Sequence, residues 1–143
     1  MTPSASHGDP SRSAPATLAT IEAALRACWD ERTCDPVDLP WSSDYPSRGQ
    51  CGVTALVLND LLGGDLMVAE VLFPDGSRQG WHTWNVFGDG LEVDLTRDQF
   101  RADEAIQPGD RITRPPGRPS REPERYELLR DRVQAALSLD RLG

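Results

Sequence analysis

Three side chains in the sequence could together perform nucleophilic catalysis: Cys51, His82 and Asp94. A cysteine nucleophile needs a base that removes the thiol proton, and the chain has 2 histidines. His7 lies in a leader rich in proline, serine and glycine, which leaves His82. A catalytic imidazole is usually oriented by an aspartate or an asparagine, and Asp94 follows His82 by 12 residues. The residue types therefore predict a Cys-His-Asp triad.

Cys51 is the first residue of the most apolar segment, which predicts a mostly buried helix over residues 51–62 that ends at a Gly-Gly pair. The positive end of a helix dipole and the unbonded backbone N–H groups at a helix start stabilise a thiolate. The same N–H groups can bind a negatively charged oxygen. Gly52 leaves space for a substrate, and Gln50 is a candidate second donor to that oxygen.

His82 and Asp94 fall on two predicted strands, 81–87 and 91–95, which are joined by a tight glycine-rich turn. Positions 82 and 94 lie nearly opposite each other across this hairpin. Both are even, so without a bulge their side chains face the same side of the sheet. Asn85 is the rival orienting group, but its odd position faces the other side, which favours Asp94.

Four aromatic residues are candidate walls of a substrate cleft: Trp41, Tyr45, Trp81 and Trp84. The first two lie in a proline-rich loop, and the other two flank His82 on its strand. Aromatic residues in such positions either pack on a core or line a cleft. For Trp81 and Trp84 we expect one of each.

Each catalytic candidate also has an ordinary structural interpretation. A lone cysteine in a helix is more often a small buried apolar residue, and a lone histidine on a strand is more often structural. A zinc site built from Cys28, Cys34 or Cys51 with His82 is disfavoured, because there is no close cysteine pair and no second histidine outside the leader. We expect neither a metal nor a cofactor.

The remaining pattern predicts an α+β protein. Residues 1–15 are expected to form a disordered leader, followed by a single domain over 16–143. The central helix at Cys51 packs on a small antiparallel sheet of about three strands and is flanked by N- and C-terminal helices. The expected elements besides those named above are a helix at 16–32, a strand at 66–73, a short helical turn opened by Thr96 and Gln99 as a capping box, a proline-rich loop at 101–121 and a helix that begins at Glu122.

Composition excludes several functions. The 143 residues carry a net charge of −8, which argues against a nucleic-acid partner, since such modules are usually basic. No segment approaches the roughly 18 apolar residues that span a bilayer, so we expect a cytoplasmic protein with no membrane partner. All 15 basic residues are arginine, which removes Schiff-base chemistry on lysine. Three cysteines cannot form a closed disulfide framework.

Several separated motifs resemble the YunG-like family of small bacterial proteins. They are the stretch Gly49-Gln50-Cys51-Gly52-Val53-Thr54-Ala55-Leu56-Val57, the stretch His82-Thr83-Trp84-Asn85 and the stretch Glu92-Val93-Asp94-Leu95-Thr96-Arg97-Asp98-Gln99-Phe100. The segments 24–29 and 125–129 also fit. The resemblance covers roughly residues 24–100 and the last helix, and it implies no particular substrate.

More distantly, the order of a helix-opening cysteine, a His-x-Trp strand and a strand ending Val-Asp-Leu-Thr resembles the core of transglutaminase-like and other papain-like enzymes. This resemblance implies a papain-like fold, with Cys51 as nucleophile, His82 as base and Asp94 as the orienting group. The chain is shorter than typical transglutaminase-like domains and lacks their extra strands.

These observations predict cysteine-dependent acyl transfer by a hydrolase or an acyl or amide transferase. An amide, ester or thioester in a small molecule or a peptide would acylate Cys51, and water or an amine would release the acyl group. One alternative is a non-catalytic binding module that uses the four aromatic residues. The other is a thiol redox sensor in which Cys28 or Cys34 resolves an oxidised Cys51. The sequence does not indicate an oligomeric state.

Overall fold

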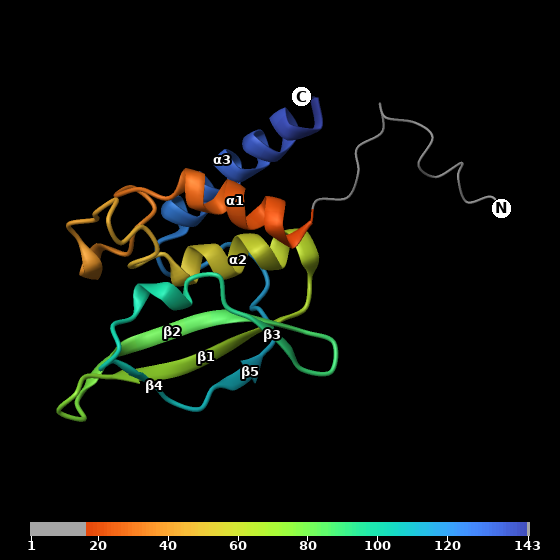
Figure 1. The fold of residues 1–143 in the computed structure, drawn as a ribbon. Helices are drawn as coiled ribbons and strands as arrows, with labels where there is room; N and C mark the ends of the chain where they lie inside the picture. Colours follow the sequence, from red (N-terminus) through yellow and green to blue (C-terminus); the bar gives the residue numbers. More distant parts are fainter. Residues whose placement is uncertain (1–16, 143) are drawn as a thin grey trace.

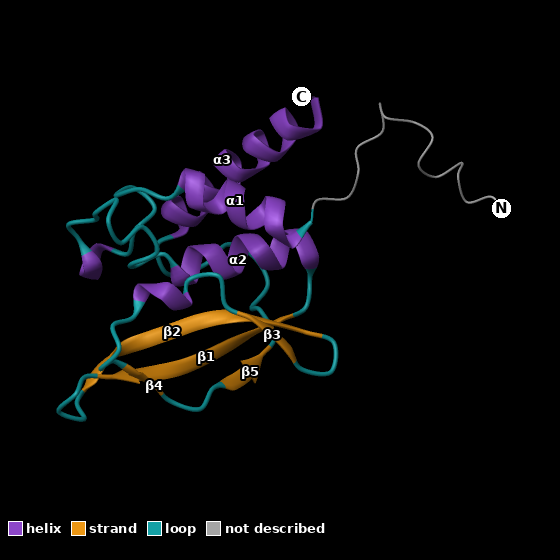
Figure 2. Ribbon diagram, viewed as in Figure 1, coloured by secondary structure: helices purple, strands orange, loops and turns teal. Residues whose placement is uncertain are grey.

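A computed structural model describes residues 17–142, and the leader predicted at residues 1–15 lies outside the described residues. The described residues form three helices and five strands, with one short 3-10 turn at Pro36–Asp38 and another at Arg97–Gln99 (Figures 1 and 2). The helices are α1 (Leu18–Cys28), α2 (Cys51–Leu62) and α3 (Pro123–Leu142). The strands are β1 (Asp65–Leu72), β2 (Arg78–Phe87), β3 (Leu91–Val93), β4 (Ala105–Ile106) and β5 (Asp110–Ile112). This is the α+β class that the sequence predicts.

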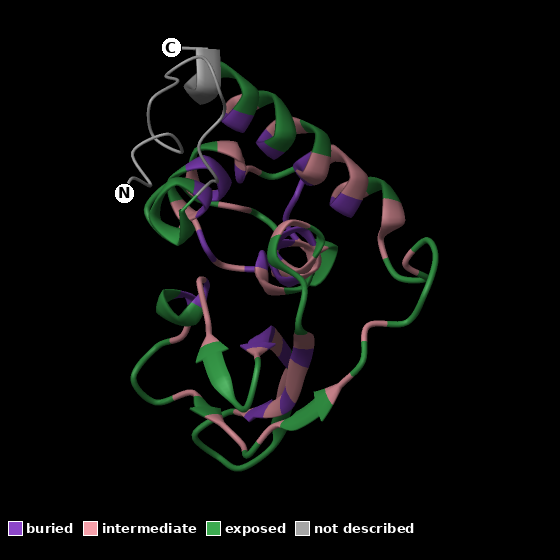
Figure 3. Cartoon of the chain, turned by 90° about the vertical axis from the view of Figure 1, so that its right-hand side faces the viewer, coloured by how far each residue is buried: buried purple, intermediate pink, exposed green. Residues whose placement is uncertain are grey.

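Helix α2 lies between the other two helices and the sheet (Figures 1 and 3). It begins at Cys51 and ends at Leu62, as predicted, because Gly63 adopts a positive φ of 76° that stops the helix. Helix α1 ends at Cys28, four residues before the predicted end. The residues after it form a turn in which Asp30 Oδ1 accepts a hydrogen bond from Arg32 N at 2.8 Å.

The sheet is antiparallel, with strand order β3-β2-β1-β4 and with β5 also paired to β1. The prediction of about three strands was wrong, because residues 101–121 are not only a loop. Strand β4 pairs with Val71 and Leu72 at one end of β1, and β5 pairs with residues 66–68 near the other end. Strands of two and three residues are too short to show alternation in a sequence. They form because the second edge of β1 offers unpaired backbone groups.

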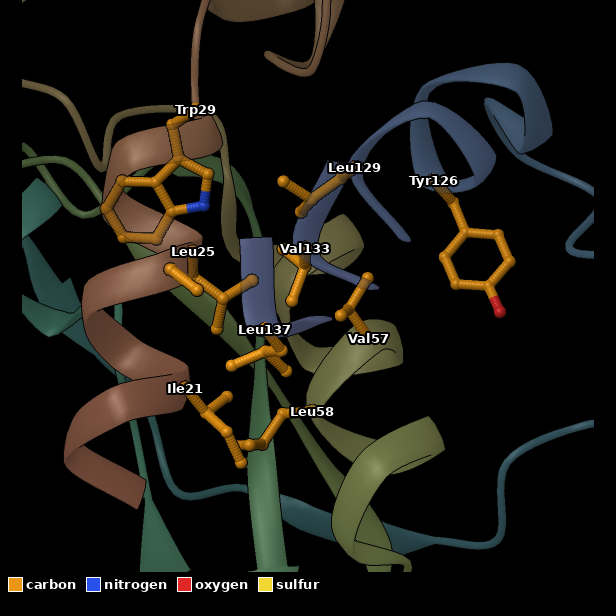
Figure 4. Close-up of a cluster of buried hydrophobic side chains, with 10 residues drawn as sticks. Ile21, Leu25, Trp29, Val57, Leu58, Tyr126, Leu129, Val133 and Leu137 are labelled. Atoms are coloured by element: carbon orange, nitrogen blue, oxygen red, sulfur yellow. The ribbon is translucent and has the colours of Figure 1, made fainter. Parts of the chain in front are cut away.

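The main hydrophobic core joins the three helices rather than the sheet (Figure 4). One face of α3 is buried and packs against both α1 and α2. The labelled core residues are Ile21, Leu25, Trp29, Val57, Leu58, Tyr126, Leu129, Val133 and Leu137. Trp29 Nε1 also donates a hydrogen bond of 2.8 Å to Thr54 Oγ1. The core therefore fixes α2, and with it the position of Cys51. Within residues 17–142, no helix is both long and apolar enough to cross a membrane.

This packing predicts the effect of truncating one core residue on α3. Leu129→Ala removes a fully buried side chain and should lower the free energy of unfolding by about 3 kcal/mol. Leu139→Ala on the same helix is the matched control, because Leu139 is 69% exposed and its truncation should cost less than about 0.5 kcal/mol. Urea denaturation measures both. Equal losses in the two variants would contradict the described core.

Candidate active site

Cys51 occupies the start of α2, and that start has no side-chain cap. The N-cap residue is Gln50, and the first helical hydrogen bond runs from Thr54 N to Gln50 O at 3.0 Å. The backbone N–H groups of Cys51, Gly52 and Val53 precede that bond and are the donors that a helix start leaves unbonded. Cys51 and Gly52 both line a pocket. The helix start therefore presents a thiol and unbonded N–H donors to the same space.

Gly49 makes the turn into α2 possible. Its φ is +76°, and a Cβ atom there would lie 2.5 Å from Cys34 Sγ. Its N–H donates to Gln99 Oε1 at 3.2 Å. Only glycine meets both the backbone and the packing requirement without strain, so this residue fixes the direction from which the chain reaches Cys51.

His82 and Asp94 are in direct contact. His82 Nε2 lies 2.6 Å from Asp94 Oδ2, and because a carboxylate only accepts, Nε2 carries the hydrogen. The pairing of Asn85 with Val93 in the β2–β3 ladder places His82 and Asp94 at the same parity, as expected from the sequence. His82 is fully buried. Its second nitrogen, Nδ1, is buried and has no hydrogen-bond partner among the described residues.

Two aromatic rings hold the His82 ring in place. Trp84 stacks on it with ring centroids 5.2 Å apart, and Phe100 meets it edge-on at 4.7 Å. Trp84 is itself fixed, because its Nε1 donates to Glu92 Oε1 at 2.7 Å. The imidazole is therefore restrained by two aromatic rings and at Nε2, which leaves Nδ1 as its one unbonded polar atom among the described residues.

The surroundings of His82 favour its protonated form. Burial lowers the pKa of His82, but the hydrogen bond to Asp94 and the neighbouring Cys51 side chain raise it more, to about 9. At neutral pH the imidazole is therefore a cation that contacts Asp94 and neighbours Cys51.

The pocket beside Cys51 has a volume of about 630 Å³. It lies between the first half of α2, strands β1 and β2, and the segment 112–122 from the predicted proline-rich loop. Trp81, 60% exposed, stands at this pocket, whereas Trp84 is buried behind His82. The expectation of one cleft residue and one core residue for this pair agrees with the structure. Trp84 was predicted as a binding residue and instead supports the imidazole.

The other predicted binding residues lie elsewhere. Gln50 is fully buried, and its side chain binds Asp30 O at 3.1 Å and the Thr33 hydroxyl at 2.8 Å. It anchors the preceding loop and was wrongly expected to face an oxyanion. Asn85 donates to Ala55 O at 2.9 Å and so ties β2 to α2.

Trp41 and Tyr45 were also wrongly expected at the cleft. Trp41 Nε1 donates to Pro46 O at 3.0 Å, and Tyr45 is 58% exposed on the loop surface. Neither residue lines the pocket. A proline-rich loop gives no period from which the direction of its side chains could be read.

Sequence reasoning missed the role of Gln99. Its Nε2 donates to Thr96 Oγ1 at 3.1 Å, and its Oε1 accepts from Gly49 N. The spacing of Thr96 and Gln99 indicated a capping box, but Thr96 caps no backbone N–H here. The pair instead joins the segment after Asp94 to the turn before Cys51. The spacing of Thr96 and Gln99 predicts a contact between these two residues, but it cannot predict the contact of Gln99 with the distant Gly49.

The other two cysteines differ from Cys51 in their surroundings. Cys34 is buried and does not share a disulfide, and burial with nearby carboxylates raises the pKa of its thiol to about 11. Burial also raises the pKa of Cys28. Neither environment favours a reactive thiolate. Among residues 17–142, no group of three His, Cys, Asp or Glu side chains converges as metal ligands would.

Comparison with known proteins matches residues 17–138 to a family described as "YunG protein". The chain belongs to the YunG family. Cys51, His82 and Asp94 all fall inside the matched residues. Over 82 residues the chain is 40% identical to the "Uncharacterized protein YunG" of Bacillus subtilis (strain 168). That alignment covers 57% of this chain and 62% of the length of the relative. No solved structure matches this member of the YunG family.

The raised pKa of His82 has a consequence for stability. The folded protein holds this proton more tightly than the unfolded chain, in which a histidine has its ordinary value of about 6.5. The resulting stabilisation is complete below about pH 6.5 and is lost as the pH rises through the folded value of about 9.

Proton NMR titration tests this environment directly. We expect the ring resonances of His82 to titrate near pH 9, with those of His7 identified in a His7→Gln variant. Asp94→Asn and Cys51→Ala should each lower the midpoint, because each removes a group that favours the imidazolium. A midpoint at or below about 6.5, or one that neither variant moves, would contradict the described contacts.

Proposed function

We propose that the protein catalyses cysteine-dependent acyl transfer through Cys51, His82 and Asp94. The observation that supports this most is the state of His82. One of its nitrogens is bound to Asp94 at 2.6 Å, and the other is buried without a partner in a ring whose pKa the neighbouring Cys51 helps to raise. A purely structural histidine would satisfy both nitrogens, since unpaired buried polar atoms are costly.

Each residue has a distinct role in the proposed reaction. The Cys51 thiolate attacks the carbonyl carbon of an amide, ester or thioester, and a C–S bond forms as the carbonyl electrons move to oxygen. The N–H groups at the start of α2 stabilise that oxyanion. When the oxyanion collapses, the bond to the leaving group breaks and His82 transfers its proton to that group. Asp94 orients the imidazole throughout.

The acyl-enzyme is then released by water or by an amine. His82, now neutral, removes a proton from the incoming nucleophile and keeps it as the C–S bond breaks, so the Cys51 thiolate and the protonated His82 are restored. The first nucleophile makes the protein a hydrolase and the second makes it a transferase. The substrate is a small molecule or a peptide, and the reaction as written calls for no cofactor.

The order of the three residues along the chain also supports the proposal. A cysteine that opens a helix, followed by a histidine on a strand and an aspartate directly after the adjacent antiparallel strand, is similar to the core of transglutaminase-like and papain-like enzymes. We propose that Cys51, His82 and Asp94 have the same roles here as the corresponding residues of those enzymes. The two alternatives have less support, since Trp41 and Tyr45 lie away from the pocket and Cys34 is buried with a raised pKa.

Thiol alkylation tests the proposal. At about pH 6, where an ordinary thiol is almost fully protonated, iodoacetamide should label Cys51 at least about tenfold faster than Cys28 or Cys34 in the same molecule. Peptide mass spectrometry assigns the label to each cysteine. His82→Gln should remove most of this advantage, because a dipole alone contributes less than a paired imidazolium.

The matched control is Trp41→Phe, which changes an aromatic residue outside the pocket and should leave the labelling rate within about twofold. The proposal fails if Cys51 reacts no faster than Cys28, or if His82→Gln leaves its rate unchanged in a variant that remains folded by circular dichroism.

A further inference from the structure

We infer that the acyl group of the substrate is apolar and occupies the pocket that extends from Cys51 beneath α2. This inference rests on the proposed function and adds its substrate class. The pocket walls supplied by the helix are Cys51, Gly52, Val53 and Leu56. At about 1.5 Å per residue, Leu56 lies about 7.5 Å along the axis from Cys51. One part of the pocket therefore runs from the thiol along the helix past Val53 and Leu56.

The sheet supplies an apolar surface opposite the helix. Val68 of β1 pairs with Thr83 of β2, and Leu66 of β1 pairs with Ile112 of β5. All four line the pocket. Because paired residues point to the same face, these side chains form one contiguous surface below Val53 and Leu56. An acyl chain attached to Cys51 would lie between two apolar layers.

The proline-rich segment closes the third side. Pro115, Pro116 and Pro119 line the pocket, and arginines hold the segment against the helices. Arg114 Nη1 donates to Leu56 O at 3.1 Å, and Arg118 pairs with Glu127 at 2.9 Å. The proline-rich segment is thus bound to α2 through Arg114 and to α3 through Arg118.

The charged groups around the pocket are already paired with each other. Every arginine that lines it has a carboxylate partner: Arg48 with Asp38 and Glu104, Arg114 with Asp60, Arg118 with Glu127, Arg121 with Asp35 and Arg125 with Glu122. An anionic acyl group would have to displace one of these carboxylates and lose its hydration. The pocket therefore favours an uncharged acyl group.

The covalent step is the same as in the proposed function. The C–S bond to Cys51 forms, the bond to the leaving group breaks, and the leaving group departs with the proton of His82. What the pocket adds is selection of the acyl chain. Each further buried methylene should raise the acylation rate about fourfold, the factor that corresponds to the usual transfer free energy of one methylene.

Single-turnover acylation by p-nitrophenyl esters tests this inference. The release of p-nitrophenolate, with intact mass to locate the adduct on Cys51, is compared for the acetate, butanoate, hexanoate and monoanionic glutarate esters. We expect the hexanoate ester to acylate Cys51 at least about tenfold faster than the acetate, and the glutarate ester to be slower than the butanoate.

Two variants at Val68 test where the acyl chain of the substrate binds. Val68→Phe fills the floor of the pocket and should abolish the preference for hexanoate over acetate. Val68→Ala enlarges the pocket and should shift the preference to the octanoate ester. The second variant keeps the test decisive if the first does not fold.

The outcomes separate the two proposals. If iodoacetamide labels Cys51 rapidly but acetate or glutarate is the fastest ester, the apolar acyl group is wrong and the proposed function stands. If hexanoate is preferred but Val68→Phe leaves the preference unchanged in a folded protein, the acyl chain does not bind in this pocket and the inference is overturned. Slow labelling of Cys51 by iodoacetamide overturns both.

Discussion

The contact between His82 Nε2 and Asp94 Oδ2 is the interaction on which the site depends. It fixes the tautomer and the plane of a fully buried imidazole, and it offsets the cost of keeping a proton on that ring away from water. Asp94 is held in turn by the backbone N–H of Thr96 at 3.2 Å. Removing Asp94 would leave a buried charge without its partner, so the pair stabilises the site as a unit rather than through either residue alone.

The rest of the fold brings Cys51 to that pair. The helical core holds α2 through Val57 and Leu58, and Gln99 joins the segment that follows Asp94 to the turn that precedes Cys51. The start of α2 has no side-chain cap, although a serine or aspartate there would stabilise the helix by about 1 kcal/mol. Helix α2 is therefore less stable at its start than a capped helix would be. Its first backbone N–H groups stay available to bind a ligand.

The features that sequence predicted are those with a strong local signal. Helix α2 was placed because its apolar run is long and ends at glycine, and the His82–Asp94 contact followed from the parity of two strands joined by a short turn. The directions of Gln50, Trp41 and Tyr45 were not predictable, because loop side chains follow no period. Strands β4 and β5 depend on a distant partner, β1, and a two- or three-residue strand carries no pattern of its own.

The proposed reaction requires a thiolate at Cys51 that is paired with a protonated His82 at neutral pH. The ultraviolet absorbance of the thiolate, taken as the difference between the wild-type protein and Cys51→Ala, measures this directly across the pH range. We expect a thiolate signal that is already present at neutral pH and is lost in His82→Gln. A signal that emerges only in the alkaline range of an ordinary thiol, and is the same in His82→Gln, would contradict it.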